Sequence, residues 1–363
     1  MSNFDDFSKI IINWYNENKR DLPWRNTRDP YKIWISEIIL QQTRVTQGLP
    51  YYNNFIKAFP TLTHLANSPI DKLMKIWQGL GYYSRARNMH QAAKTVLDKF
   101  NGKFPENFDE IIKLKGTGPY TAAAVSSIAF NQPVAVVDGN VSRVLSRYFG
   151  VYNPIDSTEG KNYFKKLAGK LVSLKNPAGY NQGLMDFGAL ICTPKNPKCP
   201  ECPLNKSCDA FKTGTVKELP VKISITKIKN RYFNYFVLIN RGNTFITRRN
   251  ENDIWQSLYE FPLIETNKRI PEKELLKSKE WINLISGSSY ELVYKTKVYK
   301  HVLSHRNIFA QFYLIKVHAN NFSIKGYKKV TINNLKKYPF SKLIINFIES
   351  FFCNFTSLIN LKS

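Results

Sequence analysis

Four cysteines in one short segment place the strongest constraint on how this chain can fold. The 363-residue sequence has five cysteines, and four of them, Cys192, Cys199, Cys202 and Cys208, follow the pattern C-x6-C-x2-C-x5-C. Soft sulfur ligands select zinc or an iron–sulfur cluster. Structural zinc sites usually pair two C-x2-C elements across a longer spacer, and only one C-x2-C occurs here. The pattern favours an iron–sulfur cluster and leaves structural zinc as the alternative, whereas the distant Cys353 has no assigned role.

The charge of the chain points to a polyanion as its partner. The formal net charge is +26, from 53 Lys and Arg residues against 27 Asp and Glu residues. Such an excess repels itself in a compact protein, so nucleic acid is the expected partner. Lys195, Lys198 and Lys206 lie between the four cysteines and would present a basic surface to phosphates. A basic protein that binds polyanions without specificity is the alternative.

No segment of the sequence predicts a membrane or secretory protein. No run approaches the roughly 18 apolar residues that a membrane span needs. The sequence MSNFDDFSKI at the N-terminus lacks a basic region followed by an apolar core, as a secretory signal would have. We therefore expect a reducing, intracellular compartment, where crowded cysteines bind metal rather than form disulfides.

The periodicity of apolar residues predicts two domains of different class. Up to residue 211, helical spacing predicts an all-α domain, with helices over residues 4–14, 33–47, 84–99, 121–130 and 139–149. Residues 212–231 are basic and without clear period, so we interpret them as an interdomain linker. From residue 232 to 363 we expect a smaller α+β domain, with strands over 232–240, 244–248, 292–299 and 308–317 and a packed helix over 342–361.

Two glycines between helical segments predict a phosphate-binding hairpin. They lie in the sequence Leu-Lys-Gly-Thr-Gly-Pro-Tyr, which contains Gly116 and Gly118 and ends at Tyr120. Glycine permits the tight turn and lets backbone amides approach another chain. The N–H groups at the start of the following helix can bind a phosphate. Together these features favour a contact with the DNA backbone that does not depend on sequence.

Two carboxylates are candidates for acid–base chemistry. Glu37 lies in an otherwise apolar helical segment, where desolvation would raise its pKa and suit it to act as a general acid. Asp138 precedes a helix, whose amino-terminus favours the ionised form. Carboxyls with opposite shifts are typical of enzymes that cleave glycosidic bonds. The alternatives are that Asp138 is only a helix cap and that Glu37 pairs with an arginine.

Several motifs occur together, and in this order they resemble those of the MutY family of adenine DNA glycosylases. This family belongs to the helix-hairpin-helix superfamily, which also contains endonuclease III. They are the glycine hairpin, the four cysteines and the segments Leu22–Arg25, Trp34–Thr43, Gly79–Arg87 and Val137–Val141. The resemblance is strong over residues 4–211 and weaker over 232–363. It implies an all-α helix-hairpin-helix glycosylase domain whose loop at 192–208 binds a [4Fe-4S] cluster, followed by a smaller Nudix-like α+β domain.

The resemblance also implies a set of site residues. Glu37 would protonate an adenine flipped out of the helix, Asp138 would stabilise the oxocarbenium-like sugar, and Tyr120 and Asn140 would support them. The adenine pocket would be formed by Trp24, Arg25, Leu40 and Gln182. Contacts with DNA or with the oxidised guanine opposite the adenine would come from Gln42, Thr43, Leu80, Tyr82, Gly116, Gly118, Ser304 and His305.

The implied activity is removal of adenine from double-stranded DNA that contains A:8-oxoguanine or A:G mispairs. Relatives of the endonuclease III kind have a lysine at position 120, but tyrosine cannot form a Schiff base, so we expect a monofunctional enzyme. In the segment Val302–Arg306, which resembles the loop that recognises oxidised guanine, Leu303 stands where the family usually has an aromatic residue. Read without the family, His301 and His305 are simply polar positions at a strand edge. We expect a monomer in a bacterial cytoplasm, associated with the nucleoid.

Three other functions compete with this interpretation. A bifunctional pyrimidine glycosylase is disfavoured by Tyr120 and by the second domain. A non-enzymatic iron–sulfur DNA-binding protein would not need both carboxylates. Nucleotide hydrolysis by the second domain is disfavoured because no acidic metal-binding signature follows Trp255–Pro262, the segment that resembles the Nudix entry motif.

Overall fold

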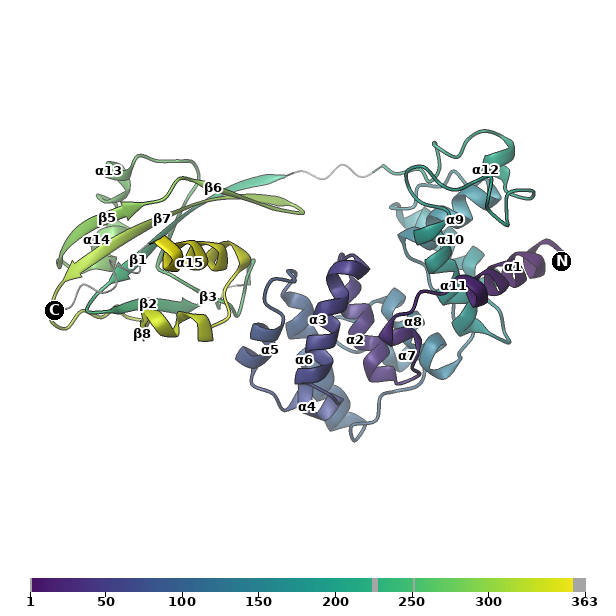
Figure 1. The fold of residues 1–363 in the computed structure, drawn as a ribbon, viewed down its shortest axis with the longest axis horizontal. Helices are drawn as coiled ribbons and strands as arrows, with labels where there is room; N and C mark the ends of the chain where they lie inside the picture. The colour runs from purple at the N-terminus through teal and green to yellow at the C-terminus, as the bar shows by residue number, and fades with distance from the viewer. Residues whose placement is uncertain (1, 224–227, 251, 355–363) are drawn as a thin grey trace. The chain divides into compact units, whose positions relative to one another are not determined.

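A computed structural model describes residues 2–223, 228–250 and 252–354 of the chain. It divides into two compact units, Met1–Ser68 with Arg87–Ile225 and Pro69–Ala86 with Thr226–Ser363. Figure 1 labels the helices and strands of both units. Among the described residues, no helix combines the length and apolarity that a membrane span requires.

The first unit is helical, as the apolar periodicity predicts (Figure 1). Its elements are α1 (Ser2–Asn18), η1 (Pro23–Arg25), α2 (Pro30–Leu40), α3 (Val45–Ala58), α4 (Leu62–Ala66), α6 (Ser84–Lys99, from Arg87 onward), α7 (Phe108–Ile111), α8 (Pro119–Phe130), α9 (Gly139–Phe149), α10 (Thr158–Leu171), α11 (Pro177–Leu190) and α12 (Asp209–Lys212). The helix expected over 33–47 is wrong beyond residue 40. There α2 ends and Gln42 adopts a left-handed φ of 57°, which a continuing helix excludes.

Helix α11 lies among α1, α8 and α9 and approaches two of them closely. A Cβ added to Gly183 would lie 2.9 Å from the Cβ of Tyr15 on α1. A Cβ added to Gly188 would lie 2.7 Å from the Cβ of Asn140 on α9. These approaches are possible because glycine has no side chain. They fix α11, which carries Gln182, against the segment that carries Asn140.

The second unit combines α5 (Ile70–Ile76) with a mixed α+β fold. One sheet has the order β4-β1-β7-β5, with β6 also pairing to β7, and the other has the order β3-β2-β8. Only β1 and β7 pair in parallel among the described strand ladders. The elements are β1 (Lys229–Ile239), β2 (Asn243–Arg248), β3 (Tyr259–Glu260), β4 (Leu263–Thr266), α13 (Glu272–Leu275), α14 (Lys279–Ile285), β5 (Ser289–Lys295), β6 (Tyr299–Leu303), β7 (Arg306–His318), β8 (Lys328–Thr331), η2 (Ile332–Lys337) and α15 (Lys342–Asn354).

Alternating side chains of β1 divide the core of this unit into two layers. Phe233 and Tyr235 belong to the cluster that contains Phe347 of α15. Phe236 belongs to the cluster that contains Trp281 of α14. A strand places successive side chains on opposite faces, so α15 and α14 cover different faces of the β1–β7 sheet. Both layers are consistent with the Nudix-like α+β architecture.

Two expectations for the second unit need correction or completion. The strand expected over 292–299 is two strands, β5 and β6. It breaks at Thr296, whose N–H donates to Phe312 O at 3.0 Å and whose Oγ1 accepts from Phe312 N at 3.0 Å. The expected C-terminal helix is confirmed as far as Asn354 by α15. The rest of that prediction, residues 355–361, lies outside the described residues.

Part of the segment expected to be a linker is held against the first unit. Leu219 is buried, and its carbonyl accepts from Arg147 Nε at 3.0 Å. The N–H of Ile223 donates to Asp156 Oδ1 at 3.1 Å. At the other end, β1 begins at Lys229. Specific hydrogen bonds therefore hold Leu219 and Ile223 of this segment against the first unit.

Candidate active site

Glu37 lies on α2 in an apolar setting, as its neighbours in sequence predict. The residue is 5% exposed, and its Oε2 accepts a hydrogen bond from Tyr120 Oη at 2.7 Å. Tyr120 is the second residue of α8, so the hairpin that precedes α8 also positions its hydroxyl. Burial raises the pKa of Glu37, while the hydrogen bond from Tyr120 and the positive charge of Arg25 oppose that rise. The structure thus supports a carboxyl that retains a proton at higher pH than usual.

Asp138 caps α9, and both of its oxygens accept hydrogen bonds. Oδ1 accepts from the N–H of Val141 at 2.7 Å and Oδ2 accepts from Asn140 Nδ2 at 3.0 Å. Burial raises the pKa of Asp138, and the hydrogen bonds from Val141 and Asn140 oppose the rise, as does the charge of Arg143. The backbone N–H groups at the amino-terminus of α9 favour the ionised form, as predicted, but desolvation outweighs them, so the expectation that Asp138 shifts in the opposite direction to Glu37 is wrong.

The two carboxyls nevertheless differ in how well their ionised forms are stabilised. Asp138 accepts from two donors and has Arg143 nearby, whereas Glu37 accepts from the single hydroxyl of Tyr120. Hydrogen bonds to a carboxylate favour its charged form. Asp138 and Glu37 also interact electrostatically with each other and with Tyr120. The arrangement places a carboxyl suited to donate a proton beside one better suited to remain ionised.

A chain of hydrogen bonds runs from Asp138 to the cysteine loop. Asn140 donates to Asp138, and its Oδ1 accepts from Arg143 Nη2 at 2.9 Å. Arg143 Nε then donates to the carbonyl of Cys192 at 2.7 Å, and its Nη2 donates to Gly188 O at 2.6 Å. Asn140 is therefore held by Asp138 on one side and by Arg143 on the other, a position from which it can support the Asp138 carboxylate.

The residues expected to form an adenine pocket come from three elements of the first unit. Trp24 and Arg25 lie on η1, Leu40 ends α2, and Gln182 lies on α11. Trp24 is buried and packs edge-on against Tyr52, with ring centroids 4.9 Å apart. The positive charge of Arg25 lowers the pKa of Glu37, so these two side chains interact electrostatically.

The glycine hairpin has the geometry that its sequence requires. Gly116 has a φ of +77°, and a Cβ there would lie 2.6 Å from the Cβ of Asn88. Gly118 is the N-cap of α8 and has open space around it. A side chain is excluded at the first glycine by both strain and crowding, which leaves the backbone of the turn accessible.

The residues expected to contact the duplex differ in exposure. Gln42 is exposed with a left-handed φ of 57°, and Thr43 is half-buried in the turn that follows α2. In the second unit Tyr82 is 44% exposed with a φ of 46°, whereas Leu80 is only 6% exposed. Tyr82, Gln42 and Thr43 are therefore accessible side chains, and Leu80 packs inside the protein.

The segment expected to recognise oxidised guanine, Val302–Arg306, is a tight turn between β6 and β7. Leu303 pairs with Arg306 across it, and Ser304 and His305 form its exposed tip. Leu303 packs partly against the apolar core of the unit. The Ser304 hydroxyl forms a hydrogen bond with the hydroxyl of Tyr82, so the structure brings together two of the expected DNA-contact residues.

The four cysteines line one cavity, and their surroundings fit an iron–sulfur cluster. Cys192, Cys199, Cys202 and Cys208 share this cavity with Arg147, whose Nη1 lies 3.4 Å from Cys192 Sγ. Burial raises the pKa of the Cys202 thiol to about 12 and also raises those of Cys199 and Cys208, so bound metal is needed to hold them as thiolates. Four cysteine thiols on one cavity are a donor set that suits an iron–sulfur cluster.

Comparison with known proteins assigns this arrangement to a family. A curated adenine DNA glycosylase of Buchnera aphidicola subsp. Schizaphis graminum is 39% identical over 278 residues, which are 76% of this chain and 78% of the relative. One from Buchnera aphidicola subsp. Baizongia pistaciae is 37% identical over 310 residues, or 84% of each chain. The chain belongs to the adenine DNA glycosylase family.

Three family models match parts of this adenine DNA glycosylase family member, in the order that the sequence predicts. Residues 35–170 match the HhH-GPD superfamily of base excision DNA repair proteins, and residues 234–350 match the NUDIX domain. Residues 192–208 match the iron–sulfur binding domain of endonuclease III. The cofactor is accordingly a [4Fe-4S] cluster held by the four cysteines of this loop, and the predicted fold class is confirmed.

Solved structures resemble the glycosylase part of this family member. A thermostable thymine-DNA glycosylase aligns with a TM-score of 0.54 and 34% identity over 58% of this chain and 97% of that chain. A non-covalent endonuclease III–DNA complex aligns with a TM-score of 0.50 and 24% identity, over 59% of this chain and 99% of that chain. The second similarity supports the helical fold.

Sequence reasoning missed three polar residues beside the expected pocket. Asp186 on α11 is fully buried, and its Oδ1 accepts from Arg25 at 2.9 Å and from Arg20 at 2.5 Å. Tyr15 donates to Gln182 Oε1 from α1. The same signal that identified Glu37, an acid inside an apolar helix, also marks Asp186 in the sequence.

Proposed function

We propose that this protein is a base excision repair glycosylase that removes adenine mispaired with 8-oxoguanine or guanine in double-stranded DNA. The observation that carries the proposal is the buried Glu37 carboxyl, which accepts from Tyr120 beside the N-capping Asp138. A glycosidic bond is cleaved when one group protonates the leaving base and another stabilises the sugar cation. The family of the chain supports adenine as the leaving base.

The reaction follows from the positions of these groups. Adenine leaves the helix stack and enters the site, because its bond to the sugar is not accessible inside a duplex. Glu37 donates its proton to N7 of the base, and the electron pair of the C1′–N9 bond moves to the departing adenine. The Asp138 carboxylate stabilises the positive charge left on the sugar, and water then adds to C1′ and loses a proton. Tyr120 and Asn140 hold the two carboxyls in place.

The other residues of the site support binding and recognition in this proposal. Trp24, Arg25, Leu40 and Gln182 contact the adenine, and the hairpin at Gly116 and Gly118 binds a backbone phosphate. Gln42, Thr43 and Tyr82 act at the duplex beside the lesion, and the buried Leu80 supports the segment of Tyr82 from inside the protein. Ser304 and His305 read the base opposite the adenine. Cys192, Cys199, Cys202 and Cys208 would hold the [4Fe-4S] cluster, which would keep the loop at 192–208 in a fixed shape.

The proposal includes the division of the chain and its setting. Residues 1–211 would form the glycosylase domain, 212–231 the interdomain linker and 232–363 the recognition domain. The protein would act as a monomer in the bacterial cytoplasm, associated with the nucleoid and not with a membrane. The enzyme would be monofunctional, because the phenol at position 120 cannot form a Schiff base with the sugar.

Adenine release from defined duplexes tests this function. Wild-type protein should release adenine opposite 8-oxoguanine or guanine faster than opposite thymine. Glu37→Gln should abolish release while DNA binding persists, and the exposed Glu106→Gln should behave as wild type. Turnover by Glu37→Gln would refute the role of the acid, and borohydride trapping of a covalent adduct on abasic DNA would refute monofunctional action.

A further inference from the structure

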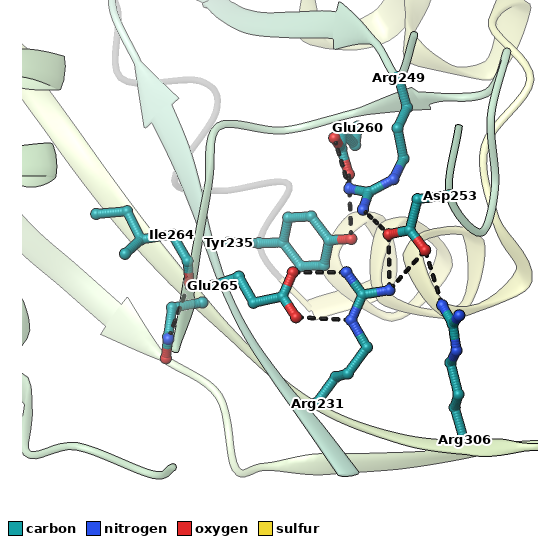
Figure 2. Close-up of polar contacts among 9 residues, drawn as sticks. Arg231, Tyr235, Arg249, Asp253, Glu260, Ile264, Glu265 and Arg306 are labelled. Carbon is teal, nitrogen blue, oxygen red and sulfur yellow. Dashed lines mark hydrogen bonds and ion pairs between the residues drawn. The ribbon is translucent and has the colours of Figure 1, made fainter. Parts of the chain in front are cut away.

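Three arginines converge on one carboxylate in the second unit. Asp253 follows β2 in the chain, and its oxygens lie 2.7 Å from Arg249 Nη2, 2.7 Å from Arg306 Nη1 and 2.6 Å from Arg231 Nη1. Figure 2 shows the three guanidinium groups directed at this carboxylate. Arg231 belongs to β1, Arg249 follows β2, and Arg306 begins β7. Asp253 therefore joins three segments that are far apart in sequence.

The charges around Asp253 balance, so the cluster is not an open anion site. Arg231 also binds both oxygens of Glu265 at 2.6 Å, and Arg249 also binds both oxygens of Glu260 at 3.0 and 2.9 Å. Three arginines thus face three carboxylates (Figure 2). Charge-assisted hydrogen bonds of this kind are directional and fix the geometry of both partners. The six charged groups therefore bind one another, with Arg306 and Glu265 each 38% exposed at the edge of the cluster.

The pKa of Asp253 reflects these contacts. Burial by itself would raise the pKa, but the N–H of Ile254 and the three guanidinium groups outweigh it and hold the pKa well below its usual range. The carboxylate therefore stays ionised throughout the pH range in which DNA is a duplex. Its charge therefore favours the contacts with Arg231, Arg249 and Arg306 over this whole range.

Arg306 connects this cluster to the tight turn between β6 and β7. It follows His305 directly and pairs with Leu303 across the turn. Among the described residues, Asp253 is the acidic partner that the structure gives Arg306. The turn has two further hydrogen bonds, one from Lys229 N to His305 O at 3.1 Å and one between the hydroxyls of Ser304 and Tyr82. Val302 beside it is 66% exposed, so apolar packing alone does not fix this end of the hairpin.

We propose that Asp253 is a positioning residue that sets the orientation of the Ser304–His305 turn through Arg306. The inference rests on the proposed function, in which this turn reads the base opposite the adenine. Hydrogen bonds to a base edge need precise placement of the donor and acceptor atoms. A residue that never touches DNA would thereby influence which mispair is recognised.

The test compares two duplexes with one variant and one matched control. Asp253→Asn keeps the size of the side chain and removes its charge. Glu272→Gln removes another ion pair of the same unit, the 2.6 Å contact with Lys295. Single-turnover adenine release and the Kd are measured with adenine opposite 8-oxoguanine and opposite guanine. Asp253→Asn should reduce the preference for 8-oxoguanine about tenfold, since well-placed hydrogen bonds to a base edge discriminate against the wrong base by roughly tenfold or more, and the control should keep it.

A double-mutant cycle separates positioning from general stability. If Asp253 acts through the turn, Asp253→Asn should add nothing in a background in which Ser304 and His305 are both alanine. An equal loss on both duplexes, or a full additional loss in that background, would overturn the inference. If Asp253→Asn does not fold, Arg306→Gln breaks the same connection at a more exposed position and is judged by the same outcomes.

Failure of this inference is distinguishable from failure of the proposed function. A wild-type protein that shows no preference between the two duplexes refutes recognition by the turn, and the role of Asp253 falls with it. A wild-type preference that survives unchanged in both Asp253→Asn and Arg306→Gln overturns only the positioning role.

Discussion

Replacing Gly116 by alanine should destabilise the hairpin by an amount that the structure predicts. The residue has a φ of +77°, and an added Cβ would lie 2.6 Å from the Cβ of Asn88. The left-handed conformation costs an L-residue roughly 1–2 kcal/mol, and crowding in a packed site costs about 1–3 kcal/mol. The sum is roughly 2–5 kcal/mol, a large share of the 5–15 kcal/mol by which proteins are typically stable.

Gly118 provides the matched control, since it lies two residues away in the same turn. Its φ is −88°, and no atom lies within 4 Å of an added Cβ. Alanine there reduces the entropy of the unfolded chain, worth about 0.4–1 kcal/mol. It also replaces glycine at a helix N-cap, a cost of similar size at about 0.5–1 kcal/mol. The two effects nearly cancel, so Gly118→Ala should be close to wild type in stability.

Urea unfolding of the cluster-containing proteins measures both variants, and binding to a duplex with a non-cleavable adenine analogue reports on the phosphate contact. Gly116→Ala should unfold at lower urea and bind the duplex more weakly, because the turn must shift away from Asn88. Equal unfolding midpoints for Gly116→Ala, Gly118→Ala and wild type would refute the reasoning from φ and from the close contact.

Three further predictions concern the site and its support. Tyr120→Phe removes a hydrogen bond that lowers the pKa of Glu37, so the pKa of Glu37 should rise further. If Glu37 is the proton donor, adenine release should then persist to higher pH in the pH–rate profile. An alkaline limit that stays in place or moves to lower pH would contradict this. Asp186→Asn leaves the buried charge of Arg25 without its carboxylate partner. The free energy of unfolding in urea should fall by about 3–5 kcal/mol, and adenine release should weaken. A variant of wild-type stability would exclude a structural role for this ion pair. Removal of iron should increase hydrogen exchange in the loop around Cys202 and in the contacts of Arg147, and unchanged protection there would show that the cluster does not organise the loop.

The sequence predicts elements with strong local patterns and fails where distant contacts decide. The helices at 84–99 and 139–149 have one apolar face and appear with the expected bounds. The residues from Ile33 to Leu40 are apolar on most sides, so they show no clear period. The change to polar residues at Gln41 coincides with the end of α2, and the expectation over 33–47 does not use it. The strand break at Thr296 depends on hydrogen bonds to Phe312, which is 16 residues away.

The site shows the same division between local and distant information. Glu37 is predicted correctly as a desolvated acid, because its own helix supplies the apolar neighbours. The direction of the pKa shift of Asp138 is not predicted correctly. Desolvation of this carboxyl depends on the folded surroundings, and it exceeds the effect of the amino-terminus of its own helix. Asp186 and Asp253 are missed as partners of arginines because those pairs form only when separate segments meet.

The close approaches of α11 have a consequence for inherited or engineered variation. Gly183 directly follows Gln182, and Gly188 lies two residues after Asp186. Gly183 has no room for a methyl group against Tyr15, and Gly188 has none against Asn140. An alanine at either position would push α11 outward and move the side chains of Gln182 and Asp186 out of place. Activity could thus be lost through a change that alters no charge and no hydrogen-bonding group, and screens that examine only polar residues would overlook it.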